Sequence, residues 1–106
     1  MKAERLYTEF RAHGVANPGG RLLLRASDAV ALVAEAADEG VPILGIDVRR
    51  VVAGAVDPSS EDRADFRAQV AEGHGCWADA EAFIRAQHGA EPLFGLTLGD
   101  DPLEVV

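Results

Sequence analysis

Apolar residues recur at helical spacing in three segments of the chain: residues 2–13, the segment between Ser27 and Gly40, and residues 77–88. Ser27 or Asp28 is a candidate N-cap for the second segment, and Gly40 is a candidate left-handed residue at its end. Each segment is followed by a glycine, which is typical of a helix end. The spacing therefore predicts three amphipathic helices.

Two other segments are typical of strands. Residues 43–52 follow Pro42 and are rich in Ile and Val, and residues 93–98 form a second apolar run. We expect these two strands to be neighbours, and Gly45 and Gly95 within them to mark bulges or close packing. The short run at residues 21–25 is left open as a third strand or a lead-in to the next helix.

Residues 60–72 fit both periodicities. Ala64, Phe66, Ala68 and Val70 alternate as in a strand, but the same residues also satisfy a helix. The pair Ser59 and Asp62 resembles a capping box, so we favour a helix here and keep the strand as the alternative. Together the segments predict a single α+β domain over residues 1–106, with helices packed on one face of a small sheet.

The composition is that of a folded domain. Apolar residues make up 48% of the chain and charged residues 26%. Cys76 is the sole cysteine, so no intrachain disulfide is expected. The first residues do not resemble a secretory signal, and no apolar run approaches the roughly 20 residues that cross a bilayer. We therefore expect a cytoplasmic protein without a membrane partner.

The charge is distributed unevenly along the sequence. Residues 1–53 carry seven basic and seven acidic side chains, whereas residues 54–106 carry three arginines against eleven acids. The net charge of −8 thus lies in the second half, which favours a cationic protein partner and disfavours nucleic acid. The candidate partner-binding acids are Asp47, Asp57, Glu61, Asp62, Asp65 and Glu72.

Residues 73–77 are the one stretch with an enzymatic pattern. A thiol at Cys76, just before a helix, would have a lowered pKa, and His74 could act as its base. The alternative is that the glycines separate two helices while Cys76 packs as a small apolar residue. We favour this alternative, because no third group orients the histidine, and we expect no catalytic residues. The three histidines lack metal-ligand spacing, so neither a metal nor a cofactor is expected.

The order of the motifs resembles a known family. A helix is followed by a strand that begins with Ile43, Leu44 and Gly45 and continues to Asp47. Next come a helix with Trp77, Ala80, Phe83 and Ile84, and a strand with Phe94, Leu96 and Leu98. This order is similar to that of the immunity protein 40 family of bacterial polymorphic toxin systems. The resemblance implies an α+β inhibitor that binds a cognate toxin domain and has no catalytic residues.

The sequence therefore favours a non-enzymatic, immunity-type inhibitor that occludes a basic toxin domain. Two other interpretations stay open. One is a small enzyme or ligand-binding domain that uses residues 74–76, and the other is a homodimeric structural or regulatory subunit.

Overall fold

The computed structural model describes residues 2–14, 22–52, 54–56, 62–87 and 92–99, with only the backbone described at residues 52, 55, 56 and 62. The fold is α+β, as predicted. In chain order its elements are α1 (Lys2–Phe10), the 3₁₀ turn η1 (Arg11–His13), α2 (Ala26–Glu39), β1 (Ile43–Val52), β2 (Ala55–Val56), β3 (Asp62–Asp65), α3 (Arg67–Ala71), α4 (Trp77–Ala86) and β4 (Pro92–Leu98).

The sheet is built around β1. It pairs antiparallel with β4 along nearly its whole length, which confirms the predicted neighbours, and with β3 over residues 45–48 on its other side. A two-residue strand, β2, folds back on the end of β1. Of the open run at residues 21–25, Leu24 forms an isolated bridge to Phe94, and Arg21 lies outside the described residues.

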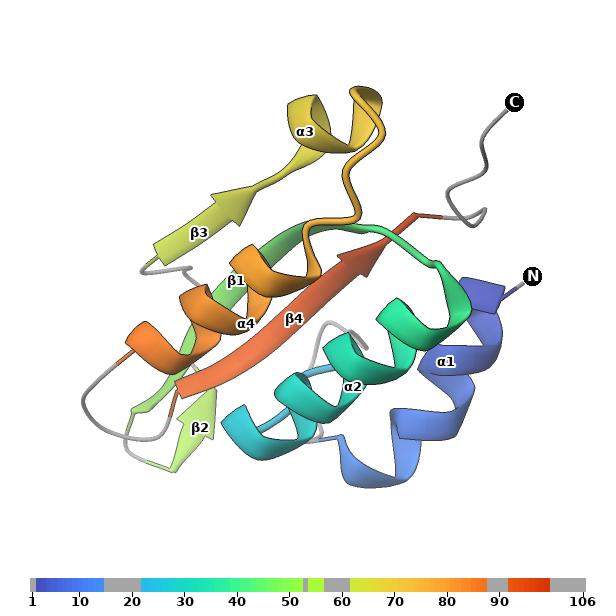
Figure 1. Cartoon of the computed structure of the whole chain (residues 1–106). Coiled ribbons are helices and arrows are strands. Elements are labelled where there is room, and N and C mark those ends of the chain that lie inside the picture. The colour runs from blue at the N-terminus through green and yellow to red at the C-terminus, as the bar shows by residue number, and fades with distance from the viewer. Residues whose placement is uncertain (1, 15–21, 53, 57–61, 88–91, 100–106) are drawn as a thin grey trace.

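Helices α1, α2 and α4 cover one face of this sheet (Figure 1). The alternation of β1 and β4 directs Ile46, Val48, Phe94 and Leu96 into a core with buried side chains of α1, α2 and α4. Tyr7 of α1 fastens the outermost helix to β4, because its hydroxyl donates to the Leu96 carbonyl at 3.0 Å and accepts from the Leu98 amide at 2.8 Å. The predicted placement of the helices on one face is therefore confirmed.

The predicted C-terminal end of α2 agrees with the structure, but its predicted N-cap does not. Gly40 adopts the expected left-handed conformation, with φ of 71°. The predicted N-cap is wrong, because the helix begins at Ala26 and Arg25 occupies the cap without a side-chain hydrogen bond. Ser27 and Asp28 lie inside the first turn, where the Asp28 carboxylate suits the positive end of the helix dipole.

The helix favoured over residues 60–72 is wrong in its first part. Residues Asp62–Asp65 form β3, and only Arg67–Ala71 are helical. The partner strand decides this, because β1 offers an edge to which β3 pairs, and the Phe66 amide continues that pairing by donating to the Leu44 carbonyl at 2.9 Å. Ser59, the other half of the proposed capping box, lies outside the described residues.

The two strand glycines differ. The register between β1 and β4 shifts between Ile43 and Gly45, which confirms an irregularity at Gly45. A Cβ at that position would lie 3.0 Å from the Ala64 carbonyl oxygen. Gly95 pairs with Asp47 in regular register, so no bulge occurs there.

Candidate functional site

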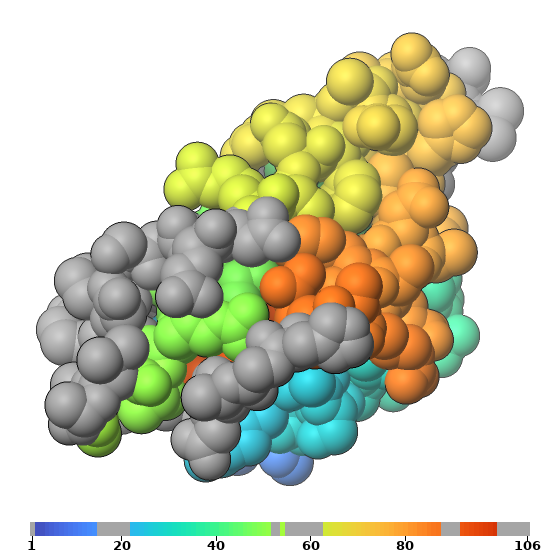
Figure 2. Space-filling model, turned by 90° about the vertical axis from the view of Figure 1, so that its left-hand side faces the viewer, coloured from blue at the N-terminus to red at the C-terminus, as the bar shows by residue number. Residues whose placement is uncertain are grey.

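A hollow of about 400 Å³ lies between α3 and the first turn of α4. In Figure 2, β3 and α3 (yellow) lie directly above α4 (orange) on this side of the molecule. The lining residues are Gln69, His74, Cys76, Trp77, Ala78 and Asp79. Part of this lining is the 73–77 segment that the sequence singled out.

The loop that shapes the hollow is held by backbone hydrogen bonds. The amides of Gly73 and His74 donate to carbonyls of α3 at 2.9 and 3.0 Å, which closes that helix. Gly73 has φ of 95°, a left-handed conformation that glycine adopts without strain. The Gly75 carbonyl then accepts from the Ile43 amide at 3.0 Å, so the loop is fastened to the start of β1.

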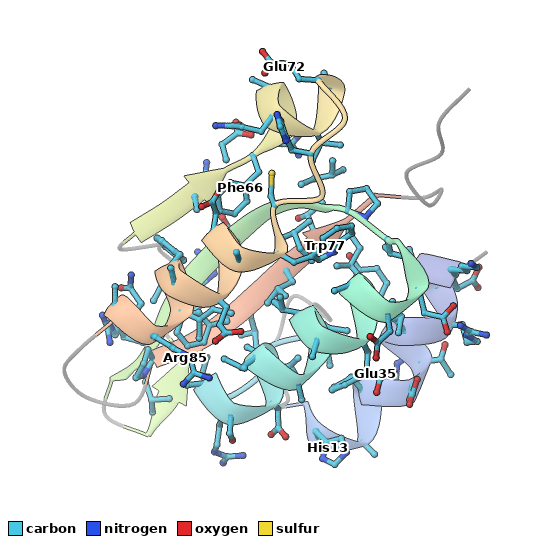
Figure 3. The ribbon with its side chains drawn as sticks, viewed as in Figure 1. His13, Glu35, Phe66, Glu72, Trp77 and Arg85 are labelled. Atoms are coloured by element: carbon cyan, nitrogen blue, oxygen red, sulfur yellow. The ribbon has the colours of Figure 1, made fainter. Side chains whose placement is uncertain are left out.

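Trp77 forms one wall and is fixed on two sides. Its indole Nε1 donates to the Val41 carbonyl oxygen at 2.7 Å. The backbone of Gly75 lies so close to the ring that a Cβ there would overlap the ring carbons. Figure 3 shows Trp77 at the start of α4 and Phe66 above that helix, toward β3. The indole is therefore a rigid part of the wall.

The thiol of Cys76 is buried, and Cys76 itself is the N-cap of α4 with a left-handed φ of 63°. Burial raises the pKa of this thiol above its ordinary value, and the negative charge of Asp79 raises it further. The catalytic alternative required a lowered pKa, and this direction is opposite to it. The thiol contacts the main-chain carbonyl of His74 at 3.8 Å rather than the imidazole. This environment favours the neutral thiol over a nucleophilic thiolate.

Two exposed acids flank α3, and a third lines the hollow. Asp65 precedes α3, Glu72 follows it, and Asp79 lines the hollow from α4. Asp65 accepts the Arg67 amide at 3.0 Å and pairs with its guanidinium at 3.6 Å. Among the described residues, neither Glu72 nor Asp79 forms an ion pair.

The four predicted acids that lie among the described residues are not gathered at one place. Asp47 and Asp65 share the sheet face that α4 does not cover, and the Asp47 side chain, 15% exposed, pairs with Arg63 at 2.9 Å. Asp62 is placed only by its register opposite Val48. Glu72 lies at the tip of α3, away from the sheet (Figure 3). Asp57 and Glu61 lie outside the described residues.

The sequence interpretation missed Asp79 and Gln69 as parts of the site. Asp79 is the third residue of α4, where an acid suits the positive end of the helix dipole, so its place in the sequence does not indicate a site. Gln69 carries no signal in the sequence, because only the fold of the 73–76 loop brings α3 beside α4. The Gly73-His74-Gly75 sequence is the one signal that a tight connection occurs here.

In the described part of the chain, no three His, Cys, Asp or Glu side chains are grouped so as to hold a metal ion. Likewise, no helix within those residues has the length and apolar character needed to cross a membrane. Comparison of the sequence with protein-family models and with curated proteins finds no match.

Proposed function

We propose that this protein is a non-enzymatic binding protein of the immunity type, which neutralises a basic toxin domain by occluding it. The observation that carries the proposal is the excess of eleven acids over three arginines after residue 53. Such an excess costs self-repulsion within a small domain, and a cationic partner would relieve it. We expect the protein to act in the cytoplasm.

The surface formed by α3 and the first turn of α4 supports this proposal. It combines the exposed acids Glu72 and Asp79 with the half-buried apolar residues Phe66, Val70 and Trp77. Protein interfaces commonly place aromatic anchors inside a polar rim. We call this surface, defined by these five residues, the α3–α4 face.

In this mechanism the acidic residues and the apolar residues have different roles. Charge complementarity mainly accelerates association and excludes wrong partners, while buried anchors set the dissociation rate. The immunity type rests on the resemblance in residues 43–47, 77–84 and 94–98, most of which are core positions in this fold.

The test uses the purified protein and the purified polypeptide encoded by the gene directly upstream, where a toxin gene would lie. Affinity is measured by calorimetry while ionic strength rises from about 0.01 M to about 1 M, which shortens the Debye length from about 30 Å to about 3 Å. We expect binding that inhibits the partner's activity and weakens at least about tenfold over this range. An affinity independent of salt would contradict the electrostatic mechanism, and no binding would contradict the immunity assignment.

A charge-matched pair of variants locates the contact. Glu72→Gln removes a charge from the α3–α4 face, whereas Glu9→Gln removes one from α1, and both side chains are exposed. We expect only the first variant to weaken binding and to reduce the salt dependence.

A further inference from the structure

We infer that the hollow between α3 and α4 receives an arginine side chain of the basic partner. The inference rests on the proposed function and names the contact that the α3–α4 face would make. It is carried by the shape of the hollow, by the chemistry of its lining and by the charge of Asp79.

The hollow is large enough to admit one long side chain. Its volume is about 400 Å³, within the range of roughly 300–1,000 Å³ that pockets for drug-sized ligands occupy, so an arginine side chain enters it without filling it. The walls are fixed, because Trp77 is hydrogen-bonded to Val41 and the 73–76 loop is bonded to α3 and β1. Because the walls are already rigid, binding of a side chain does not cost conformational entropy of the lining residues.

The lining matches an arginine in two parts. Trp77, Ala78 and the Cys76 thiol offer apolar surface to the aliphatic stem. The side chains of Asp79, Gln69 and His74 offer acceptors, and none of the three forms a hydrogen bond or ion pair with the side chain or backbone of another described residue. A guanidinium carries five donors in a planar fork, so it can serve several acceptors at once, whereas an ammonium acts as a point charge.

The local charge selects a cation over an anion. The first turn of α4 alone would favour an anion, because helix N-termini carry partial positive charge. Asp79 places a full negative charge on that turn. Its effect reaches into the hollow, where it raises the pKa of the Cys76 thiol and so disfavours an anion at that atom.

The chain provides its own reporters for a direct test. Trp77 is the sole tryptophan and lines the hollow, so fluorescence excited beyond the absorption of tyrosine reports on this site. The full chain is titrated with Nα-acetyl-arginine amide, with its neutral counterpart Nα-acetyl-citrulline amide, and with Nα-acetyl-lysine amide. We expect saturable quenching or enhancement by the arginine compound, with the lysine compound weaker and the citrulline compound weaker still.

Two variants of α4 serve as the matched pair. Asp79→Asn removes the charge in the hollow, and Glu81→Gln removes one that is already paired with Arg85 at 2.8 Å on the same helix. Circular dichroism confirms that both variants fold. We expect Asp79→Asn to weaken binding of the arginine compound about threefold, as for an exposed charge pair, and Glu81→Gln to leave it unchanged. No response of the wild type to the arginine compound, equal binding of citrulline, or tighter binding of lysine would each overturn the inference.

The two proposals fail separately. If the upstream polypeptide binds with the expected salt dependence but Asp79→Asn changes its affinity no more than Glu81→Gln does, the arginine site is wrong and the inhibitor function stands. If the upstream polypeptide does not bind at all, the proposed function is wrong, and the titration with amino-acid amides still decides whether the hollow accepts a guanidinium.

Discussion

The indole Nε1 of Trp77 donates a hydrogen bond of 2.7 Å to the carbonyl oxygen of Val41, across 36 positions of the sequence. Val41 is fully buried between α2 and β1, and Trp77 is the first residue of α4. This bond therefore fixes the start of α4 against the junction of α2 with the sheet. The position of the hollow depends on it, because Trp77 is one of its walls.

Replacement of Trp77 by phenylalanine tests the bond. The phenyl ring keeps much of the apolar contact but leaves the Val41 carbonyl without its indole donor. A buried polar group that loses its partner destabilises a protein by about 1–3 kcal/mol, so we expect a loss of that size in the free energy of unfolding. Urea denaturation followed by circular dichroism measures it, since the variant has no tryptophan fluorescence. A loss below about 0.5 kcal/mol would show that the bond contributes little.

The contact between Gly75 and Trp77 gives a second prediction. A methyl group at residue 75 would overlap the indole ring, and the ring cannot move away without losing its bond to Val41. We expect Gly75→Ala to lower the free energy of unfolding by about 1–3 kcal/mol, the usual range for overpacking.

A double-mutant cycle separates this contact from other effects of the alanine. In the Trp77→Phe background the smaller ring leaves room for the methyl group, so Gly75→Ala should cost less there. Equal losses in both backgrounds would mean that the alanine acts elsewhere, for example on the backbone of the loop.

Tyr7 gives an independent prediction about the opposite edge of the helical layer. Its hydroxyl both donates to β4 and accepts from it, as described above. Tyr7→Phe removes both bonds while keeping the ring, and we expect the free energy of unfolding to fall by about 2 kcal/mol. Thr8→Val is a suitable control, because the Thr8 hydroxyl donates to the Glu4 carbonyl on the exposed side of the same helix. A loss for Tyr7→Phe no larger than for the control would contradict the role of this tyrosine.

The sequence predicted those elements whose local pattern and packing agree. Residues 43–52 have β-branched content and a preceding proline, and they also fill the centre of the sheet, so their predicted bounds match β1. The pattern of α4 likewise coincides with its buried face. Residues 62–65 differ, because they are polar and short, and only the free edge of β1 makes them a strand.

The candidate site was less predictable than the fold. The sequence pointed to Cys76, but it could not show that the thiol is buried or that Asp79 lies close enough to affect its pKa. It also selected Asp47 as a carboxylate within an apolar strand, and the other acids by their number in the second half. Asp47 and Asp65 lie on the sheet face that α4 does not cover, while Glu72 and Asp79 belong to the α3–α4 face.

The ionisation of Cys76 supplies the last prediction. Only the thiolate reacts with iodoacetamide, so the pH profile of the alkylation rate has its midpoint at the pKa of the thiol. Burial and the charge of Asp79 both raise this pKa, so the midpoint should lie above that of N-acetylcysteine, and the thiol should stay largely unreactive at neutral pH.

Asp79→Asn removes one of the two causes and should shift the midpoint downward, which increases the rate at neutral pH about twofold. High salt should reduce this difference between wild type and variant, and Glu81→Gln should not reproduce it. A wild-type midpoint at or below that of N-acetylcysteine would show that the helix N-terminus, and not burial and Asp79, controls the thiol, and it would revive the nucleophile interpretation.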